Sequence, residues 1–325
     1  MKYFYLTIVA LLFIGCGGSQ QPQPISYPTW YLNPPAHNGS SLYGVGDGTD
    51  INSAKNSALN AIAASLSVTL SSEFKKSESS KNINGNENTY KSVQNTIKTQ
   101  VKEIEFSSYQ VIQNQVTQNK VLVLVEVSRA LLLQKQKEKL DRYSKELNDE
   151  NKNISKQAVF KQSFLYSKQF SKAQRLKSLA LLCKTIDSNF NPKTSLQQVA
   201  NIQTAHNVAI NKTKVSISAS TEAKVFVDIL KEGLNKAGIR TVTSKANTHI
   251  HLKNSFQLDE IYGFKIAKAT LSISSKDRAE KTIATASLKF SGKSRYDYKK
   301  AKANSASILD KKIKKEGIYT LLGIQ

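Results

Sequence analysis

The stretch from residue 41 to residue 70, "SLYGVGDGTDINSAKNSALNAIAASLSVTL", decides how the first part of the fold is read. Its three glycines stand at alternate positions: Gly44, Gly46 and Gly48. A dinucleotide-binding loop needs Gly-x-Gly-x-x-Gly, but Thr49 stands where the last glycine should fall, and Asp47 would repel a bound pyrophosphate. The stretch is therefore interpreted as a strand-to-helix turn, in which glycine permits positive φ angles and a close approach of helix to sheet.

The residues on either side of the glycines support this interpretation. A short strand is predicted at Leu42–Val45, and a helix from about Asn52 to Leu66, with Thr49 or Asp50 as its N-cap. Small and apolar residues recur along that helix at helical spacing: Ala54, Ala58, Ala61, Ile62 and Leu66. Such a face suits a helix that lies close to a sheet. The segment "SVTLSSEF", residues 67–74, is then predicted to be a strand.

The remainder of this first module, residues 28–128, adds further elements. Trp30, in a Pro-rich segment predicted to be extended, should pack against a core. A polar stretch contains Asn84-Gly85, a hairpin signal, and a helix is expected over 90–103. Strands follow within residues 105–114 and 120–130, the second of which is apolar on both faces and should be central. The module is predicted to be α+β, a small sheet with helices on one side.

The first residues point to export and to a lipid anchor. Residues 1–15 have a lysine and then an apolar run of about eleven residues, which is too short to span a bilayer, so they are predicted to be a signal peptide. The ending "FIGC" resembles a bacterial lipobox, which makes Cys16 the predicted lipidation site and residues 16–27 a flexible tether. Acyl chains of this kind hold a protein on a membrane. The alternative is an ordinary cleaved signal with an incidental cysteine.

Charge is unevenly distributed along the chain. The formal net charge is +23, but residues 17–128 are neutral, residues 129–211 carry +9 and residues 212–325 carry +13. Such a field calls for an acidic partner or an anionic surface, or reflects a lysine-rich proteome. Nucleic acid is not expected as a partner, because the lipobox directs the chain to the envelope.

The second module, residues 129–211, is predicted to be a helical hairpin with a linker. Apolar residues recur every seven positions in its first helix: Leu133, Leu140, Leu147 and Ile154. The simplest partner for this stripe is the next helix, residues 156–186, with a turn near residues 151–155. A parallel homodimer through the heptads is the alternative.

The third module, residues 212–325, is predicted to be an α/β sandwich. The order is strand, helix, strand, then an antiparallel meander of three strands and a final helix. Gly238 stands where a helix C-cap is expected. The whole chain is therefore assigned to the α+β class, as a multi-domain protein.

The order and spacing of the motifs resemble a known family. The segments "PTWYLNPP", "LYGVGDGTDINSAKNSALNAIAASLSVTLSSEF" and "VLVLVEVSRALL" together resemble the LPP-twenty family of outer-membrane lipoproteins of epsilon-class proteobacteria. The length and layout are similar to its longer, three-part secreted or surface members. The resemblance implies no catalytic residues. The third module is similar to the N-terminal domain of TolB-type proteins and to flagellar T-ring components.

Chemistry-bearing residues do not form a recognisable active site in the sequence. Cys183 lies on the apolar stripe of a helix and is predicted to be buried. His249 and His251 face one side of a strand and could chelate a metal, but no acidic residue in that strand completes the set. Asp259 and Glu260 should point to opposite faces. No enzyme, cofactor or metal is predicted.

Three hypotheses follow. The first is a non-enzymatic lipoprotein of the outer membrane that acts as a scaffold or adaptor for flagellar or other envelope proteins. Its body would lie in the periplasm or at the surface, with palmitate on its anchor. The second is a surface-exposed or secreted binding protein that engages anionic envelope polymers or other external partners. The third, an enzyme acting on peptidoglycan or a metal, would require His249 and His251 to lie beside carboxylates in a cleft.

Overall fold

The computed structural model describes residues 27–79, 95, 97, 101, 103–117 and 119–324. The signal peptide, Cys16, the tether up to residue 26 and Asn84-Gly85 lie outside the described residues, as does most of the helix predicted at 90–103. The chain divides into two units, which we call unit 1 (residues 1–65 and 105–129) and unit 2 (residues 66–104 and 130–325). The fold is α+β, as predicted.

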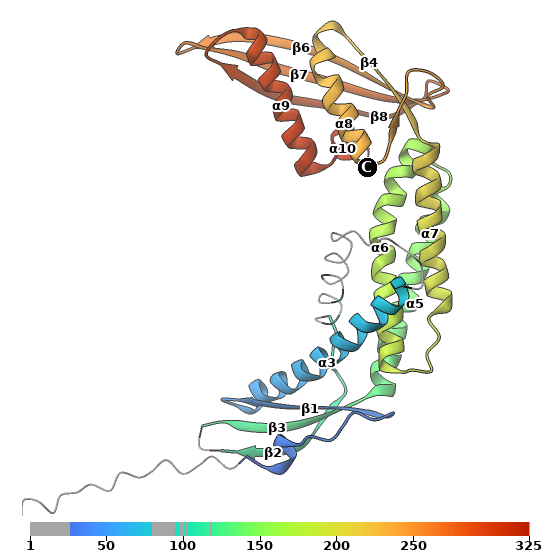
Figure 1. Cartoon of the computed structure of the whole chain (residues 1–325), viewed down its shortest axis with the longest axis vertical. Helices are drawn as coiled ribbons and strands as arrows, with labels where there is room; N and C mark the ends of the chain where they lie inside the picture. Colours follow the sequence, from blue (N-terminus) through green and yellow to red (C-terminus); the bar gives the residue numbers. More distant parts are fainter. Residues whose placement is uncertain are drawn as a thin grey trace, which may run out of the picture. The chain divides into compact units, whose positions relative to one another are not determined.

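Unit 1 is built on a three-stranded antiparallel sheet with the order β1-β3-β2 (Figure 1). Its strands are β1 (Ser41–Gly48), β2 (Tyr109–Val116) and β3 (Val121–Ser128). The prediction that β3 is central is confirmed: residues 122–125 are all buried, so both faces of the strand are covered. One cover is the one-turn helix α2 (Thr29–Leu32), which contacts β3 and carries the half-buried Trp30. The segment around Trp30 is thus helical where an extended chain was predicted.

Helix α3 (Ile51–Ser79) is longer than the sequence predicted, and the strand proposed at residues 67–74 does not exist. Every fourth residue on one face is buried: Ala54, Ala58, Ile62, Leu66, Leu70 and Phe74. This spacing is helical, and it overrides the β-propensity of "SVTL". Ser71 and Ser72 donate hydrogen bonds to the carbonyl oxygens of Ser67 and Val68, so their hydroxyls are satisfied inside the helix. The division between the two units falls within α3.

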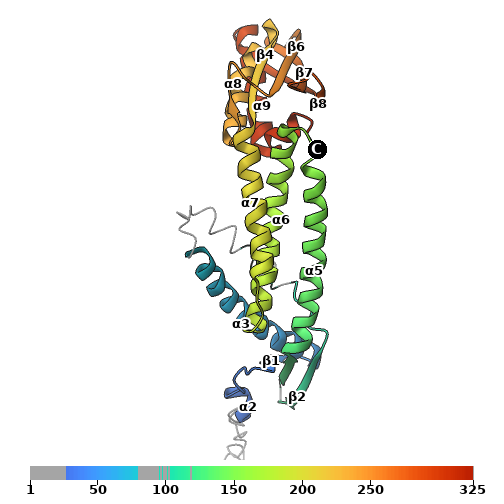
Figure 2. The same ribbon diagram turned by 90° about the vertical axis from the view of Figure 1, so that its right-hand side faces the viewer.

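Unit 2 begins with a bundle of long helices that lie side by side in both views (Figures 1 and 2). They are α5 (Arg129–Ile154), α6 (Val159–Ile186) and α7 (Lys193–Lys212). The predicted hairpin and its turn are confirmed, but the predicted linker after α6 is a third helix. Leu140 and Leu147 of the heptad stripe pack on residues of α6 and α7 in one core cluster. The stripe is therefore filled within the chain, and the homodimer interpretation is wrong.

The rest of unit 2 is a two-layer α/β domain, as predicted. Its strands are β4 (Lys214–Ala219), β5 (Arg240–Thr241), β6 (Thr248–Ile261), β7 (Phe264–Asp277) and β8 (Thr282–Ser294). They form one sheet in the order β5-β4-β6-β7-β8, in which β4 is parallel to both neighbours and β6, β7 and β8 are antiparallel.

Helices cover one face of this sheet. They are η2 (Thr221–Phe226), α8 (Val227–Lys236), α9 (Tyr298–Glu316) and α10 (Ile318–Leu321). Gly238 ends α8 with φ +76°, and the next N–H, of Ile239, donates to the Leu234 carbonyl oxygen, so the predicted C-cap is confirmed.

The helical bundle and the α/β domain share one core. Phe160 and Phe164 of α6 belong to the same buried cluster as the sheet residues. Their rings lie 5.8 Å and 5.0 Å from the ring of Tyr319 in α10, measured between centroids. The Tyr319 hydroxyl also lies 3.2 Å from Ser163 Oγ. This shared core explains why the two predicted modules form a single compact unit.

Candidate functional site

The glycines of β1 form a packing surface for α3. A Cβ atom on Gly46 would lie 2.2 Å from the nitrogen of Ala58 and 2.4 Å from the oxygen of Ala54, and one on Gly44 would lie 2.4 Å from the oxygen of Ala58. Two residues of a strand span about 6.6 Å, and four residues of a helix span about 6 Å. The alternate glycines therefore match the four-residue repeat of α3.

This geometry corrects one part of the sequence interpretation. The predicted close approach of helix to sheet is confirmed, but Gly44, Gly46 and Gly48 lie inside β1 and none of them has positive φ. Asp50 is the N-cap of α3: its Oδ1 accepts hydrogen bonds from the backbone N–H groups of Asn52 (2.8 Å) and Ser53 (3.0 Å). The backbone N–H groups of Asn52 and Ser53 are thus bound by the carboxylate of Asp50 and are not directed at a phosphate.

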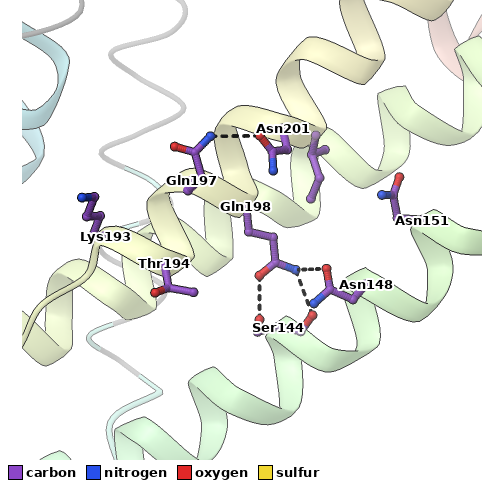
Figure 3. Close-up of a pocket in the computed structure, with 9 residues that line it drawn as sticks. Ser144, Asn148, Asn151, Lys193, Thr194, Gln197, Gln198 and Asn201 are labelled. Carbon is purple, nitrogen blue, oxygen red and sulfur yellow. Dashed lines mark hydrogen bonds between the residues drawn. The ribbon is translucent and has the colours of Figure 1, made fainter.

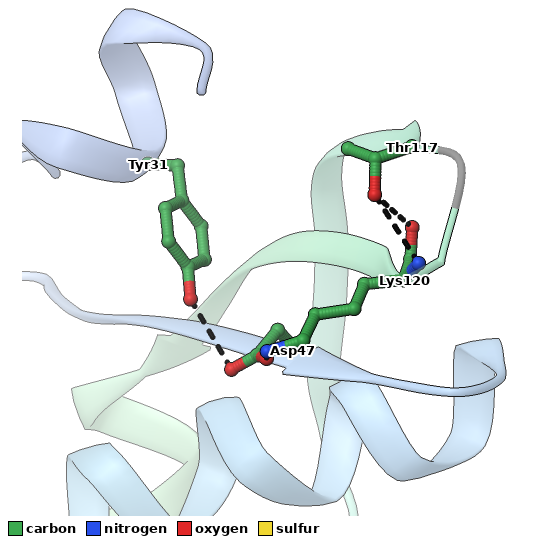
Figure 4. Close-up of polar contacts among 4 residues, drawn as sticks. All are labelled: Tyr31, Asp47, Thr117 and Lys120. Carbon is green, nitrogen blue, oxygen red and sulfur yellow. Dashed lines mark hydrogen bonds and ion pairs between the residues drawn. The ribbon is translucent and has the colours of Figure 1, made fainter. Parts of the chain in front are cut away.

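Asp47, between two of these glycines, joins three parts of unit 1 (Figure 4). Its Oδ2 lies 2.6 Å from Lys120 Nζ, and its Oδ1 accepts a hydrogen bond from the Tyr31 hydroxyl at 3.2 Å. Thr117 holds Lys120 through two further hydrogen bonds with its backbone. The hydrogen bond from Lys120 lowers the pKa of Asp47, so the carboxylate is charged and paired. Asp47 thus has a structural partner on each side.

The histidines on β6 lie on the face of the sheet opposite the helices. His249 Nδ1 lies 2.8 Å from Ser216 Oγ, and His251 Nδ1 lies 3.0 Å from Ser218 Oγ, both on β4. Their cross-strand neighbours on β7 are Lys276 and Ser274 rather than carboxylates. Within the residues that the structure describes, no group of three His, Cys, Asp or Glu side chains could hold a metal ion.

The adjacent carboxylates on β6 are separated as predicted. Asp259 pairs with Lys268 at 2.6 Å, and Glu260 pairs with Lys265. A shallow hollow of about 450 Å³ lies further along the outer face of the same sheet. It is lined mainly by basic and hydroxyl side chains, which are His251, Lys253, Ser272, Ser274, Thr285 and Ser287. Such groups can donate hydrogen bonds to an anion.

Cys183 is fully buried, as predicted. Burial raises the pKa of its thiol to about 12, so the thiolate that a nucleophile requires does not form near neutral pH. The other cysteine, Cys16, lies outside the described residues.

A second hollow, of about 480 Å³, opens between α5 and α7 (Figure 3). Amide and hydroxyl side chains dominate its lining: Ser144, Asn148, Asn151, Thr194, Gln197, Gln198 and Asn201. Gln198 is held by Ser144 and Asn148, with Ser144 Oγ donating to Gln198 Oε1 at 2.6 Å. Asn151 Oδ1 is buried and accepts no hydrogen bond from the described residues. Lys193 also lines the hollow, and the arrangement suits a small polar group. The sequence analysis missed it, because the residues come from two helices about fifty positions apart.

In the described part of the chain, no helix is long and apolar enough to cross a bilayer.

Comparisons with known proteins show what the first part of the chain is similar to. Residues 28–128 match the model of the family described as LPP20 lipoprotein, the family called LPP-twenty above. Among solved structures, the chain is similar to a minor lipoprotein from Acinetobacter baumannii, at 13% identity, with a TM-score of 0.30 and with 35% of this chain and 96% of that one covered. It is also similar to the secreted protein HP1454 from the human pathogen Helicobacter pylori, at 15% identity, with a TM-score of 0.46 and with 87% and 96% covered.

A search of curated proteins found no match. The family match confirms the resemblance that the sequence motifs indicated. It covers α2, β1, α3, β2 and β3, and so includes the glycines of β1 and the alanines of α3 described above. Residues 28–128 are therefore similar to the LPP20 lipoprotein family, and this match supports a lipoprotein of the cell envelope.

Proposed function

We propose that the chain is a non-enzymatic scaffold or adaptor of the cell envelope, held in the outer membrane by a lipid on Cys16. The observation that carries this proposal is the joining of an LPP20 lipoprotein segment, in one chain, to a second folded unit with its own core. In this proposal, the acyl chains on Cys16 hold the two units on a membrane. Flagellar or other envelope proteins are the partners proposed for it.

The surroundings of the reactive side chains support a role without catalysis. The thiol of Cys183 is buried, with its pKa raised to about 12. The imidazoles of His249 and His251 are each engaged by a serine hydroxyl, and Asp47 is engaged by a lysine and a tyrosine. Each of these groups therefore has a structural role that accounts for its position.

Lipidation can be tested in cells. The chain should incorporate labelled palmitate and fractionate with the outer membrane. Cys16→Ser should abolish labelling and release the protein from the membrane fraction. Cys183→Ser is the matched control, because it removes the other cysteine but leaves the anchor, and it should be labelled like the native chain. Unchanged labelling of Cys16→Ser would contradict the proposal.

A second candidate function is a binding protein at the cell surface or secreted from it, which engages anionic partners. The observation that favours it is the outer face of the β6-β7-β8 sheet, where exposed Lys253 and Lys289 accompany the hydroxyl-lined hollow. Protease treatment of intact cells separates the two candidates. A surface protein is digested, whereas a scaffold that faces the periplasm survives until the outer membrane is opened.

A further inference from the structure

The loop end of the β6–β7 hairpin carries exposed aromatic and apolar side chains. We define the hairpin tip as Ile261, Tyr262, Phe264, Arg295 and Tyr296. Tyr262 is 98% exposed, Tyr296 is 83% exposed and Ile261 is 46% exposed. Single exposed apolar residues are ordinary, but a group of them in one place marks an interaction site.

Tyr262, at the hairpin tip, has a backbone conformation that is unusual for a tyrosine. Ile261 pairs with Phe264, so Tyr262 and Gly263 form a two-residue turn, with φ values of +51° and +74°. Two positive φ values are typical of a type I′ turn, for which Asn-Gly is the preferred sequence. A bulky residue in this region is strained. Folding therefore does not account for the tyrosine, whose ring is displayed to solvent.

Cations surround the apolar side chains of the tip. Arg295 and Lys293 lie over the ring of Phe264, at 4.9 Å and 5.8 Å from its centroid. The nearby carboxylates of Asp259 and Glu260 are paired with Lys268 and Lys265. In the described part of the chain, neither Lys293 nor Arg295 forms an ion pair with a carboxylate. Positive charge is thus available beside the exposed rings.

The tip lies at the far end of the sheet from the helical bundle. β6 pairs with β7 along its whole length from Thr248 to Ile261, and α7 enters the sheet beside Thr248 through Asn247 and Lys214. Thirteen steps along a strand span about 40 Å. A surface that meets the tip would therefore not meet the bundle first.

We propose that the hairpin tip docks on a bilayer surface of anionic phospholipid. Tyrosine is favoured at the membrane–water interface, because its ring is apolar and its hydroxyl is polar. Ile261 supplies apolar area beside it, and Lys293 and Arg295 carry charge that complements lipid phosphates. This contact goes beyond the anchoring function proposed above, since it uses side chains of residues 261–296 and not the lipid on Cys16.

The test uses the unlipidated chain from Gly17 onward, which retains every described element. Its binding to vesicles of phosphatidylglycerol and phosphatidylethanolamine is measured by co-sedimentation. Tyr262→Asn combined with Tyr296→Ser should weaken binding about tenfold. Both changes leave the net charge unaltered, so general electrostatic attraction remains. Because Asn-Gly suits the turn, the variant should unfold at the same temperature as the native chain or higher.

The control and the charge variant make the outcome decisive. Val116→Ser removes a side chain that is 74% exposed in unit 1 and should bind like the native chain. Lys293→Gln with Arg295→Gln should also weaken binding and reduce its dependence on salt. Equal binding by the tyrosine variant and the native chain would overturn the proposal. So would binding by the native chain to an acidic protein through residue 262 with none to the vesicles.

Discussion

In both units, glycine in a strand allows a helix to pack closely on the sheet, but the number of glycines at the contact differs. In unit 1, β1 has glycine at three alternate positions, and the first turns of α3 pack against them (Figure 1). In unit 2, β8 has one such glycine, Gly292, where a Cβ atom would lie 2.2 Å from the oxygen of Ala301 and 2.3 Å from the nitrogen of Ser305 in α9.

The difference shows how strongly each contact depends on glycine. The part of α3 that faces the glycines has the small residues Ala54 and Ala58 at the contact, whereas α9 also buries Leu309 and Ile313 in a large apolar cluster. A single glycine there allows one close crossing, and side-chain packing supplies the rest. The first unit should therefore be more sensitive to an added methyl group than the second.

The largest effect is expected from Gly46→Ala. The new Cβ atom would collide with backbone atoms of Ala54 and Ala58, which cannot move without shifting the helix. We expect the free energy of unfolding of unit 1 to fall by about 3 kcal/mol. The fluorescence of Trp30, the only tryptophan in the chain, reports this unfolding. Gly39→Ala is the control, because nothing lies within 4 Å of its added Cβ atom.

Gly292→Ala should have the next largest effect. Its Cβ atom would meet the backbone of α9 as closely, but α9 is also held by apolar contacts that persist. We expect a loss of about 2 kcal/mol in unit 2. Alkylation of the buried Cys183, in the chain that begins at Gly17, reports the opening of this unit. The unfolding of unit 1, measured by Trp30 fluorescence, should be the same as in the native chain. If Trp30 fluorescence changed before Cys183 was alkylated, the two units would not be packed independently.

Tyr319→Phe tests the shared core of unit 2. The change removes the hydroxyl that lies 3.2 Å from Ser163 Oγ and keeps the ring, so about 1 kcal/mol should be lost. Burial raises the pKa of Tyr319 above its ordinary value of 10.0. The protonated hydroxyl of Tyr319 therefore contributes fully to the free energy of unfolding below about pH 10, and this contribution is lost as the pH rises through the folded-state pKa. Thermal unfolding is measured between about pH 8 and about pH 11, on either side of the ordinary tyrosine pKa. The unfolding temperature should fall less in the variant than in the native chain as the pH rises.

The smallest effect is expected from Lys120→Gln in unit 1. The pair with Asp47 is exposed, and such pairs contribute little. Because the pKa of Asp47 is lowered below 3.8 when folded, the pair contributes above that pH and is lost as the pH falls through the folded-state pKa. Native and variant chains should therefore converge in thermal stability in acid. A difference that grew in acid would contradict this role of Asp47.

In the first unit, the elements predicted correctly were those with a single clear sequence pattern. Alternate glycines facing alanines at four-residue spacing indicated close helix-to-sheet packing, and the two-sided apolar strand β3 indicated a central position. The strand predicted at residues 67–74 was wrong because β-branched residues outweighed the helical spacing of Leu66, Leu70 and Phe74.

The rest depended on tertiary contacts. α7 was predicted to be a linker, and only Val199, Ile202 and Ala209 of this helix are buried. The amide-lined hollow joins side chains of α5 and α7 that no local pattern connects. The exposure of Tyr262 and the cations around Phe264 could not be predicted from the sequence, since Arg295 and Lys293 come from β8 and the residues after it.

The central claim, that the chain is a lipid-anchored scaffold, is tested most directly by mild crosslinking in native membranes followed by purification of the chain. The account predicts discrete envelope proteins crosslinked to the lipidated chain and their loss when Cys16→Ser releases it. Recovery of the chain without any specific partner would contradict the scaffold function.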